Sequence, residues 1–224
     1  MDENTYTHIF YYSIAATFIP TIALLLKFNR QPIEYKWLAM MLLFSFLCDF
    51  MNEVQYQYFR LPVNLIGNFY VVVDPILLCG FFYHALKWKS LKLPIIIVCT
   101  IYLLLSIVNF AFVQKININT HSYIVEKLLT MLLSIGYFYR VIKELPAEKI
   151  YHIGLFWIIS SMFTFSSAKL VLYSFAYYLV VFNDNLMVLW AIHNLMSIAS
   201  NLCIALGVWI HYRRSSLAQV YIQQ

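Results

Sequence analysis

Apolar stretches of about 20 residues recur along the whole chain, and short polar segments separate them. Each stretch is long enough to cross a hydrocarbon core of about 30 Å as an α-helix. We predict spans near 8–28, 36–58, 62–86, 93–113, 121–142, 150–182 and 186–211. The pattern therefore predicts an all-α integral membrane protein, a seven-transmembrane helix bundle that occupies residues 1–224 as a single domain with no soluble domain.

Composition agrees with lipid as the main surroundings. Of the 224 residues, 62% are hydrophobic and 11% are charged, against roughly 25% charged in soluble proteins. Aromatic residues make up 18%, as expected where rings gather at two membrane interfaces. Residues 1–7 contain Asp2 and Glu3 but no basic residue, so we expect the first span to be retained and not cleaved as a signal peptide.

Basic residues alternate between the two ends of the predicted bundle. One set of loops and ends holds Lys27, Arg30, Lys36, Lys87, Lys89, Lys92, Arg140, Lys143, Lys149, Arg213 and Arg214, and the other holds Arg60 and Lys115. Because basic flanks stay on the cytoplasmic side, we expect the N-terminus outside a cell membrane and the C-terminus in the cytoplasm. The same scatter over short loops argues against a nucleic-acid partner.

Polar side chains inside the spans are the candidates for function, because burying them in hydrocarbon is costly. Most are predicted in the outer halves of the spans, above an almost wholly apolar inner half. The candidate ligand-binding residues are Asp49, Asn52, Glu53, Asn68, Asp74, Lys169, His193 and Asn194. We predict that they line an outward-opening cavity for a small polar ligand or ion; the alternative is that they only hydrogen-bond helices together.

Two further expectations concern single residues of these spans. Lys169 needs a buried counter-charge, which Asp49, Glu53 or Asp74 could supply. Glu126 and Lys127 belong to the same polar set, but they lie close enough to an interface to be merely solvated.

Neither a metal nor a cofactor is expected. The four cysteines, Cys48, Cys79, Cys99 and Cys203, all fall inside apolar stretches without a CxxC spacing. We predict that they are small hydrophobic residues with free thiols.

Three families share features with the chain. Seven spans with an external N-terminus resemble the microbial rhodopsins, whose last helix holds a retinal-binding lysine; the only lysine near that position, Lys169, precedes the last span. Ser45, Asp49 and His193 are similar to the site of the ceramidase-like membrane hydrolases, which also needs three zinc-binding histidines. For an intramembrane hydrolase, the residues themselves offer Asp49, Glu53 and His193 as the acid–base set.

The third resemblance is to the sugar facilitators built as three helices, a linking helix and three more. Asn68 and Asn194 occupy comparable depths, and each precedes a basic residue, Lys87 and Arg213, by the same number of positions. His8 and Lys27 match His121 and Arg140 in the same way. The resemblance implies a small-solute transporter made of parallel repeats.

Our leading hypothesis from the sequence is a small-ligand sensor or binding protein, not an enzyme, that signals through a separate cytoplasmic partner. It is favoured because polarity is confined to one half of the spans, whereas a transporter needs a hydrated path through both. A small-solute facilitator is the alternative, and an intramembrane hydrolase is the third.

Overall fold

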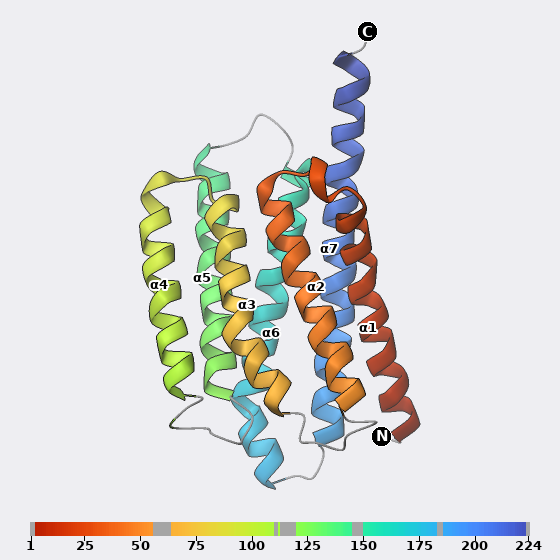
Figure 1. The fold of residues 1–224 in the computed structure, drawn as a ribbon, viewed down its shortest axis with the longest axis vertical. Coiled ribbons are helices and arrows are strands. Elements are labelled where there is room, and N and C mark those ends of the chain that lie inside the picture. The colour runs from red at the N-terminus through yellow and green to blue at the C-terminus, as the bar shows by residue number, and fades with distance from the viewer. Residues whose placement is uncertain are drawn as a thin grey trace.

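The computed structural model describes residues 3–55, 64–109, 112, 120–144, 150–182 and 186–222. These ranges contain seven α-helices, which confirms the prediction of an all-α fold (Figure 1). Each helix overlaps one predicted span. The helices are α1 (Glu3–Leu26), α2 (Ile33–Val54), α3 (Asn64–Ala85), α4 (Lys89–Val108), α5 (Thr120–Glu144), α6 (Gly154–Phe182) and α7 (Leu186–Ile222).

Two helices differ from their predicted bounds. α6 begins at Gly154, after a separate 3-10 turn at Ile150–His152. α7 continues to Ile222, although the apolar pattern stops near residue 211. Arg213 and Arg214 end the apolar pattern without ending the helix, because arginine has a high helix propensity.

Six of the seven described helices form a ring, and α4 lies outside it. Around the ring, α1 packs on α2, α2 on α3, α3 on α5, α5 on α6, α6 on α7, and α7 on α1. α4 packs mainly on α3 and lies at the edge of the bundle (Figure 1). Successive helices run in opposite directions, so α1 begins at one end of the bundle and α7 leaves it at the other.

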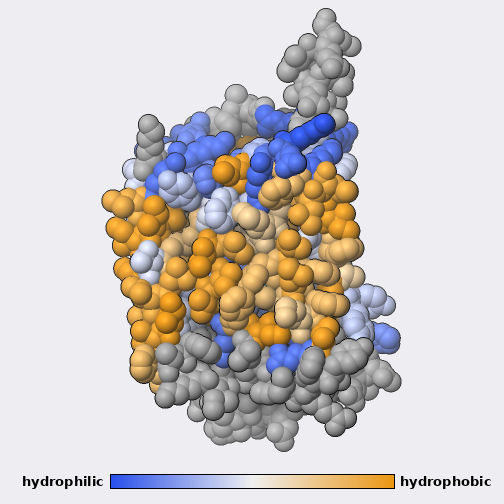
Figure 2. Space-filling model, viewed as in Figure 1, coloured by the Kyte–Doolittle hydropathy of each residue, from blue (hydrophilic) through white to orange (hydrophobic). Residues whose placement is uncertain are grey.

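Among the described residues, five helices are long and apolar enough to cross a membrane, over Thr5–Leu26, Ile66–Ala85, Ser90–Val108, Gly154–Phe175 and Val188–Arg214. A broad apolar band covers the middle of the face seen in Figure 2. These features indicate a protein embedded in a membrane. α2 and α5 are not among the five, and both carry several charged residues, such as Asp49 on α2 and Glu126 and Lys127 on α5.

Basic residues gather at the end of the bundle where α7 leaves it, which we call the basic end. Figure 2 shows a hydrophilic cap there. Several cations lie over aromatic rings: the Lys27 ammonium is 4.6 Å from the centre of the Tyr212 ring, and the Arg213 guanidinium is 5.5 Å from that of Trp209. Cations and amphipathic rings are typical of a membrane interface.

The α3–α4 connection is anchored to α5 at the basic end. Arg140 donates to the carbonyl oxygen of Ala85 at 2.8 Å and forms an ion pair with Glu144. The hydrogen bonds from Arg140, and a further one from the Trp88 indole, lower the pKa of the Glu144 carboxyl. The end of α3 is therefore held by a charged side chain from its neighbour in the ring.

The apolar core fills the half of the bundle nearest the basic end. Its fully buried side chains include Leu24, Leu38, Phe81, Phe82, Ile158 and Val208. They come from the end of α1, the start of α2, the end of α3, the start of α6 and the later part of α7. This half of the ring is therefore closed by packed hydrocarbon.

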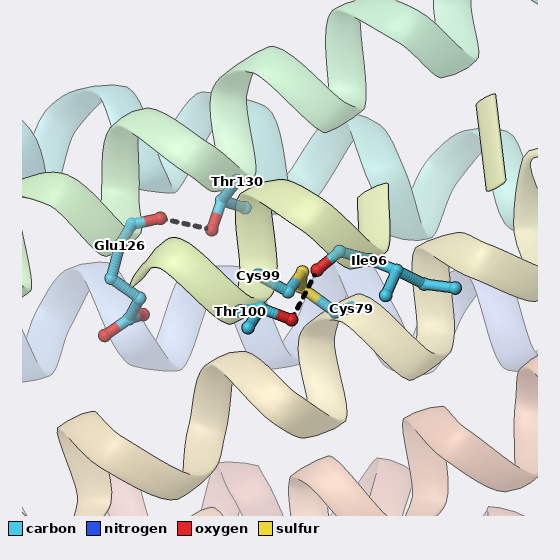
Figure 3. The surroundings of a disulfide bond; sticks show 6 residues. All are labelled: Cys79, Ile96, Cys99, Thr100, Glu126 and Thr130. Atoms are coloured by element: carbon cyan, nitrogen blue, oxygen red, sulfur yellow. Dashed lines mark hydrogen bonds between the residues drawn. A yellow bond between two sulfur atoms is a disulfide. The ribbon is translucent and has the colours of Figure 1, made fainter. Parts of the chain in front are cut away.

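A disulfide joins α3 to α4 (Figure 3). Cys79 and Cys99 face one another with their Cα atoms 6.6 Å apart, within the range for disulfides. The prediction that all four cysteines are free thiols is wrong for this pair, while Cys48 and Cys203 are free. Both bonded residues lie in apolar stretches, but the antiparallel packing of two consecutive helices brings them together.

Candidate functional site: a central ionisable cavity

A cavity of about 120 Å³ lies inside the ring, lined by side chains of α2, α3, α5, α6 and α7. Leu42, Leu78, Met162 and Ile204 belong both to its wall and to the apolar core, so the core closes it toward the basic end. Apart from Met41 and Phe165, the rest of the wall is polar. It includes the ionisable side chains of Asp74, Glu126, Lys127 and Lys169 and the hydroxyl groups of Ser45, Tyr70, Thr130 and Ser166.

Two carboxyl groups from different helices meet at this cavity. Asp74 of α3 is 4% exposed and Glu126 of α5 is 1% exposed. They are close enough to hydrogen-bond to one another, and Tyr70 is a second partner of Asp74. Two ionised carboxylates are both acceptors only, so Asp74 Oδ1 and Glu126 Oε2 are left buried without a donor.

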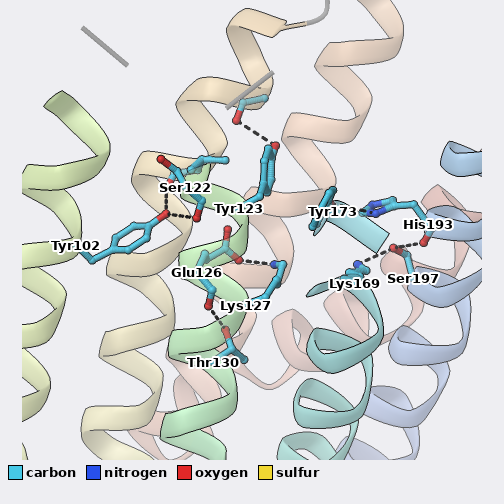
Figure 4. Close-up of polar contacts among 12 residues, drawn as sticks. Tyr102, Ser122, Tyr123, Glu126, Lys127, Thr130, Lys169, Tyr173, His193 and Ser197 are labelled. Atoms are coloured by element: carbon cyan, nitrogen blue, oxygen red, sulfur yellow. Dashed lines mark hydrogen bonds and ion pairs between the residues drawn. The ribbon is translucent and has the colours of Figure 1, made fainter. Parts of the chain in front are cut away.

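Two ammonium groups come from α5 and α6 (Figure 4). Lys127 forms an ion pair with Glu126. Lys169 donates to Ser197 Oγ on α7 at 2.9 Å. The ion pair predicted for Lys169 with Asp49 or Asp74 is wrong, because these described side chains form no such contact; the Glu53 side chain lies outside the described residues.

Glu126 and Lys127 belong to the predicted polar set of the spans but not to the predicted ligand-binding residues, because they lie close enough to an interface to be merely solvated. In the structure Glu126 is buried in the ring and both line the cavity. A signal was present, because Glu126, Thr130 and Ser134 recur at four-residue spacing and form one polar stripe of α5. A polar stripe on a membrane helix must face other helices or water.

Of the eight predicted ligand-binding residues, the structure brings Asp74 and Lys169 to this cavity. Asn68 and Asn194 are buried elsewhere in the bundle, and Asn52 Oδ1 is buried without a hydrogen-bond partner. The remaining three are Asp49, His193 and Glu53. The carboxyl group of Asp49 interacts electrostatically with Lys169, and the side chain of Glu53 is not described. Whether any of the eight binds a ligand stays a prediction.

Other polar groups form hydrogen bonds between helices, which is the role that the alternative expectation gave them. Tyr173 of α6 and His193 of α7 share a hydrogen bond of 3.1 Å (Figure 4). Asn201 of α7 donates to Thr17 of α1 at 2.8 Å. Such bonds link neighbouring helices of the ring.

Matching polar stripes lie on α1 and α5. Ser13, Thr17 and Thr21 are buried on α1, as Glu126, Thr130 and Ser134 are on α5. On both helices each hydroxyl after the first residue donates to the carbonyl oxygen one turn earlier. Aligning His8 with His121 places the two stripes in register, residue for residue.

The correspondence extends to the other helices of the ring. Aligning the sequence of α2 with that of α6 at Trp37 and Trp157 also aligns Asp49 with Lys169. Around the ring, α1, α2 and α3 form one arc and α5, α6 and α7 form the other, with α4 outside both. This order is the one expected of two parallel three-helix repeats joined by a linking helix.

Comparison with family models, curated proteins and solved structures finds no match to this chain. Within the described residues, no group of three His, Cys, Asp or Glu side chains is arranged to hold a metal ion. The geometry of the cavity is therefore the main indication of function.

Proposed function

We propose that this protein binds a small polar solute in its central cavity and carries it across a membrane. The observation that supports the proposal is the cavity itself, where two carboxyl and two ammonium groups line a space between two similar three-helix arcs. Ionisable residues inside a membrane bundle are costly and usually mark a path for solutes or ions. Transporters built from repeats bind their substrates near the middle of the bundle, between the repeats.

The cavity suits a small and polar occupant. The volume of about 120 Å³ is several times the roughly 10–15 Å³ that one water molecule needs on the same measure. Asp74 Oδ1 and Glu126 Oε2 are free to accept hydrogen bonds, and the lysines and hydroxyls can donate them. The solute is thus expected to carry hydrogen-bond donors in a molecule of only a few heavy atoms.

The apolar core next to the cavity favours alternating access over an open channel. Leu42 and Leu78 line the cavity and also pack into the core of the basic half. A solute could pass this barrier only if the arcs moved relative to one another, as in transporters whose repeats rock around a fixed site. Helices on both sides of each arc boundary would then change contacts.

A second candidate is the sensor predicted from the sequence, and the length of α7 favours it. α7 leaves the bundle at the basic end and continues to Ile222 (Figure 1). A helix that contacts the ring and also projects beyond it could pass a change in packing to a partner. A sensor would bind the solute without transporting it.

Binding and flux distinguish the two candidates. A thermal-shift screen of small polar metabolites on the purified protein should identify a stabilising solute, and Asp74→Asn and Lys169→Met should abolish the stabilisation. Glu144→Gln, which alters an exposed carboxyl on α5, is the matched control and should behave as wild type. Flux of the labelled solute into proteoliposomes supports transport; binding without flux supports the sensor; no stabilising solute contradicts both.

A further inference from the structure

Two buried carboxyl groups lie close together at the cavity, and while both are ionised neither can donate a hydrogen bond to the other. Asp74 and Glu126 lie within hydrogen-bonding reach of one another. Each has one oxygen without a donor, Asp74 Oδ1 and Glu126 Oε2. A single proton placed between the two carboxyl groups makes one of them a donor to the other. That proton would give the pair a hydrogen bond that two ionised carboxylates cannot form.

The charges around the pair also favour the uptake of one positive charge. Three described acids, Asp49, Asp74 and Glu126, act on the Lys169 ammonium group. Asp74 and Glu126 also act on Lys127. With every group ionised, the set carries one uncompensated negative charge. An uncompensated charge among buried groups is costly, so uptake of one positive charge, as a proton or as a cation, would stabilise the set.

The other groups that face the pair do not supply this charge. The tyrosines that act on it from α3, α4, α5 and α6 are neutral phenols, and His193 on α7 shares a hydrogen bond with one of them, Tyr173. These tyrosines are Tyr70, Tyr102, Tyr123 and Tyr173. Ser200 of α7, which also lines the cavity, carries no charge.

We infer that the empty cavity holds one proton between Asp74 and Glu126, and that a small monovalent cation replaces this proton when it binds. In the exchange, the cation enters between two carboxylates and the proton leaves to water, so the charge of the site is unchanged. A protonated amine fits best, because its N–H groups donate to the two oxygens that lack a donor. The solute class of the proposed function would then be cationic, and this step rests on that function.

The shared proton can be tested without any ligand. Infrared difference spectroscopy of the purified protein near neutral pH should show the C=O band of a protonated carboxyl group. Labelling the side-chain carboxyl carbons of aspartate or of glutamate with ¹³C should shift it, which assigns the band even if variants fail to fold. Asp74→Asn and Glu126→Gln should remove the band, and Glu144→Gln should retain it. A wild-type spectrum without the band, or a band that survives both variants, overturns the inference.

The exchange is tested by adding methylammonium chloride, with sodium chloride and tetramethylammonium chloride as comparisons. Methylammonium should abolish the band and release about one proton per cation bound. Its apparent affinity should rise about tenfold per pH unit while the proton is held. Tetramethylammonium has no N–H group and should have no effect; replacement by sodium alone would support the exchange but make the cation inorganic.

If no cation changes the band or releases protons, the exchange is wrong. Such a result leaves the proposed function standing if the metabolite screen finds a neutral or anionic solute. Conversely, a protonated pair in a protein that binds no solute would contradict the proposed function and keep the shared proton.

Discussion

Two glycines allow α6 and α7 to pack closely near the basic end. A Cβ atom added to Gly207 would lie 2.8 Å from the carbonyl oxygen of Gly154 and 2.7 Å from Cγ1 of Ile158. Gly207→Ala should therefore push the helices apart and lower the free energy of unfolding by roughly 1–3 kcal/mol. Denaturant unfolding in detergent would measure the loss.

Gly136 on α5 provides the matched control. A Cβ atom there would meet Leu86 at 3.8 Å, which is an ordinary contact. Gly136→Ala should leave stability unchanged or raise it slightly, because alanine favours the helix. Equal losses in the two variants would show that close packing at Gly207 is not what matters.

At single residues, the sequence predicts polar character better than it predicts contacts. Asp74 and Lys169 were identified because charge in an apolar stretch is visible in the sequence itself. The partner of Lys169 was not, because Ser197 lies on another helix and a hydroxyl there is an unremarkable residue. Glu126 lies near one end of α5, which favours solvation, but the stripe that it forms with Thr130 and Ser134 places it inside the ring.

α4 lies outside the ring, and the Cys79–Cys99 disulfide links it covalently to α3 in addition to the chain connection. Closing a loop of about 20 residues stabilises a fold by ~3 kcal/mol in the loop-entropy account. A Cys79→Ser/Cys99→Ser double variant should lose about that much stability, and amides of α4 should exchange hydrogen faster than in wild type. The ring cavity should keep its ligand response.

Reductant provides the control for the disulfide. It should lower the stability of the wild type to that of the double variant, and it should not affect the double variant itself. Cys203→Ser, which alters a free thiol, should respond to reductant as the wild type does. A wild type whose unfolding ignores reductant, in a denaturing buffer that exposes the bond, would contradict the disulfide.

The sequence predicts which segments form helices, but not which helices pack against one another. Segments rich in apolar residues coincide with all seven described helices, and five of these helices are long and apolar enough to cross a membrane. The apolar pattern does not say which faces meet, so the six-helix ring, the outer place of α4 and the disulfide all required the structure. The end of α7 was missed because helix propensity continues where hydropathy stops.

The orientation of the whole molecule is a separate prediction, based on the basic end. Single cysteines at Asn4 and Asp184 should react with an impermeant thiol reagent on intact cells, and one at Ser215 should react only after permeabilisation. The reason is that basic flanks are held on the cytoplasmic side. Labelling at Ser215 on intact cells would reverse the orientation.

The polar cavity inside the ring is expected to be filled with water, and one accessibility measurement tests this most directly. In a background with Cys48 and Cys203 replaced by alanine, Ser166→Cys places a thiol in the cavity wall, and Leu132→Cys places one on a side chain of α5 that is 67% exposed on the outer surface. Thiols react as thiolates, which need water. A small cationic thiosulfonate should therefore modify Ser166→Cys and spare Leu132→Cys, although the cavity residue is the more buried of the two. Modification of Leu132→Cys with Ser166→Cys unreactive would show that the centre of the ring is dry and contradict the account.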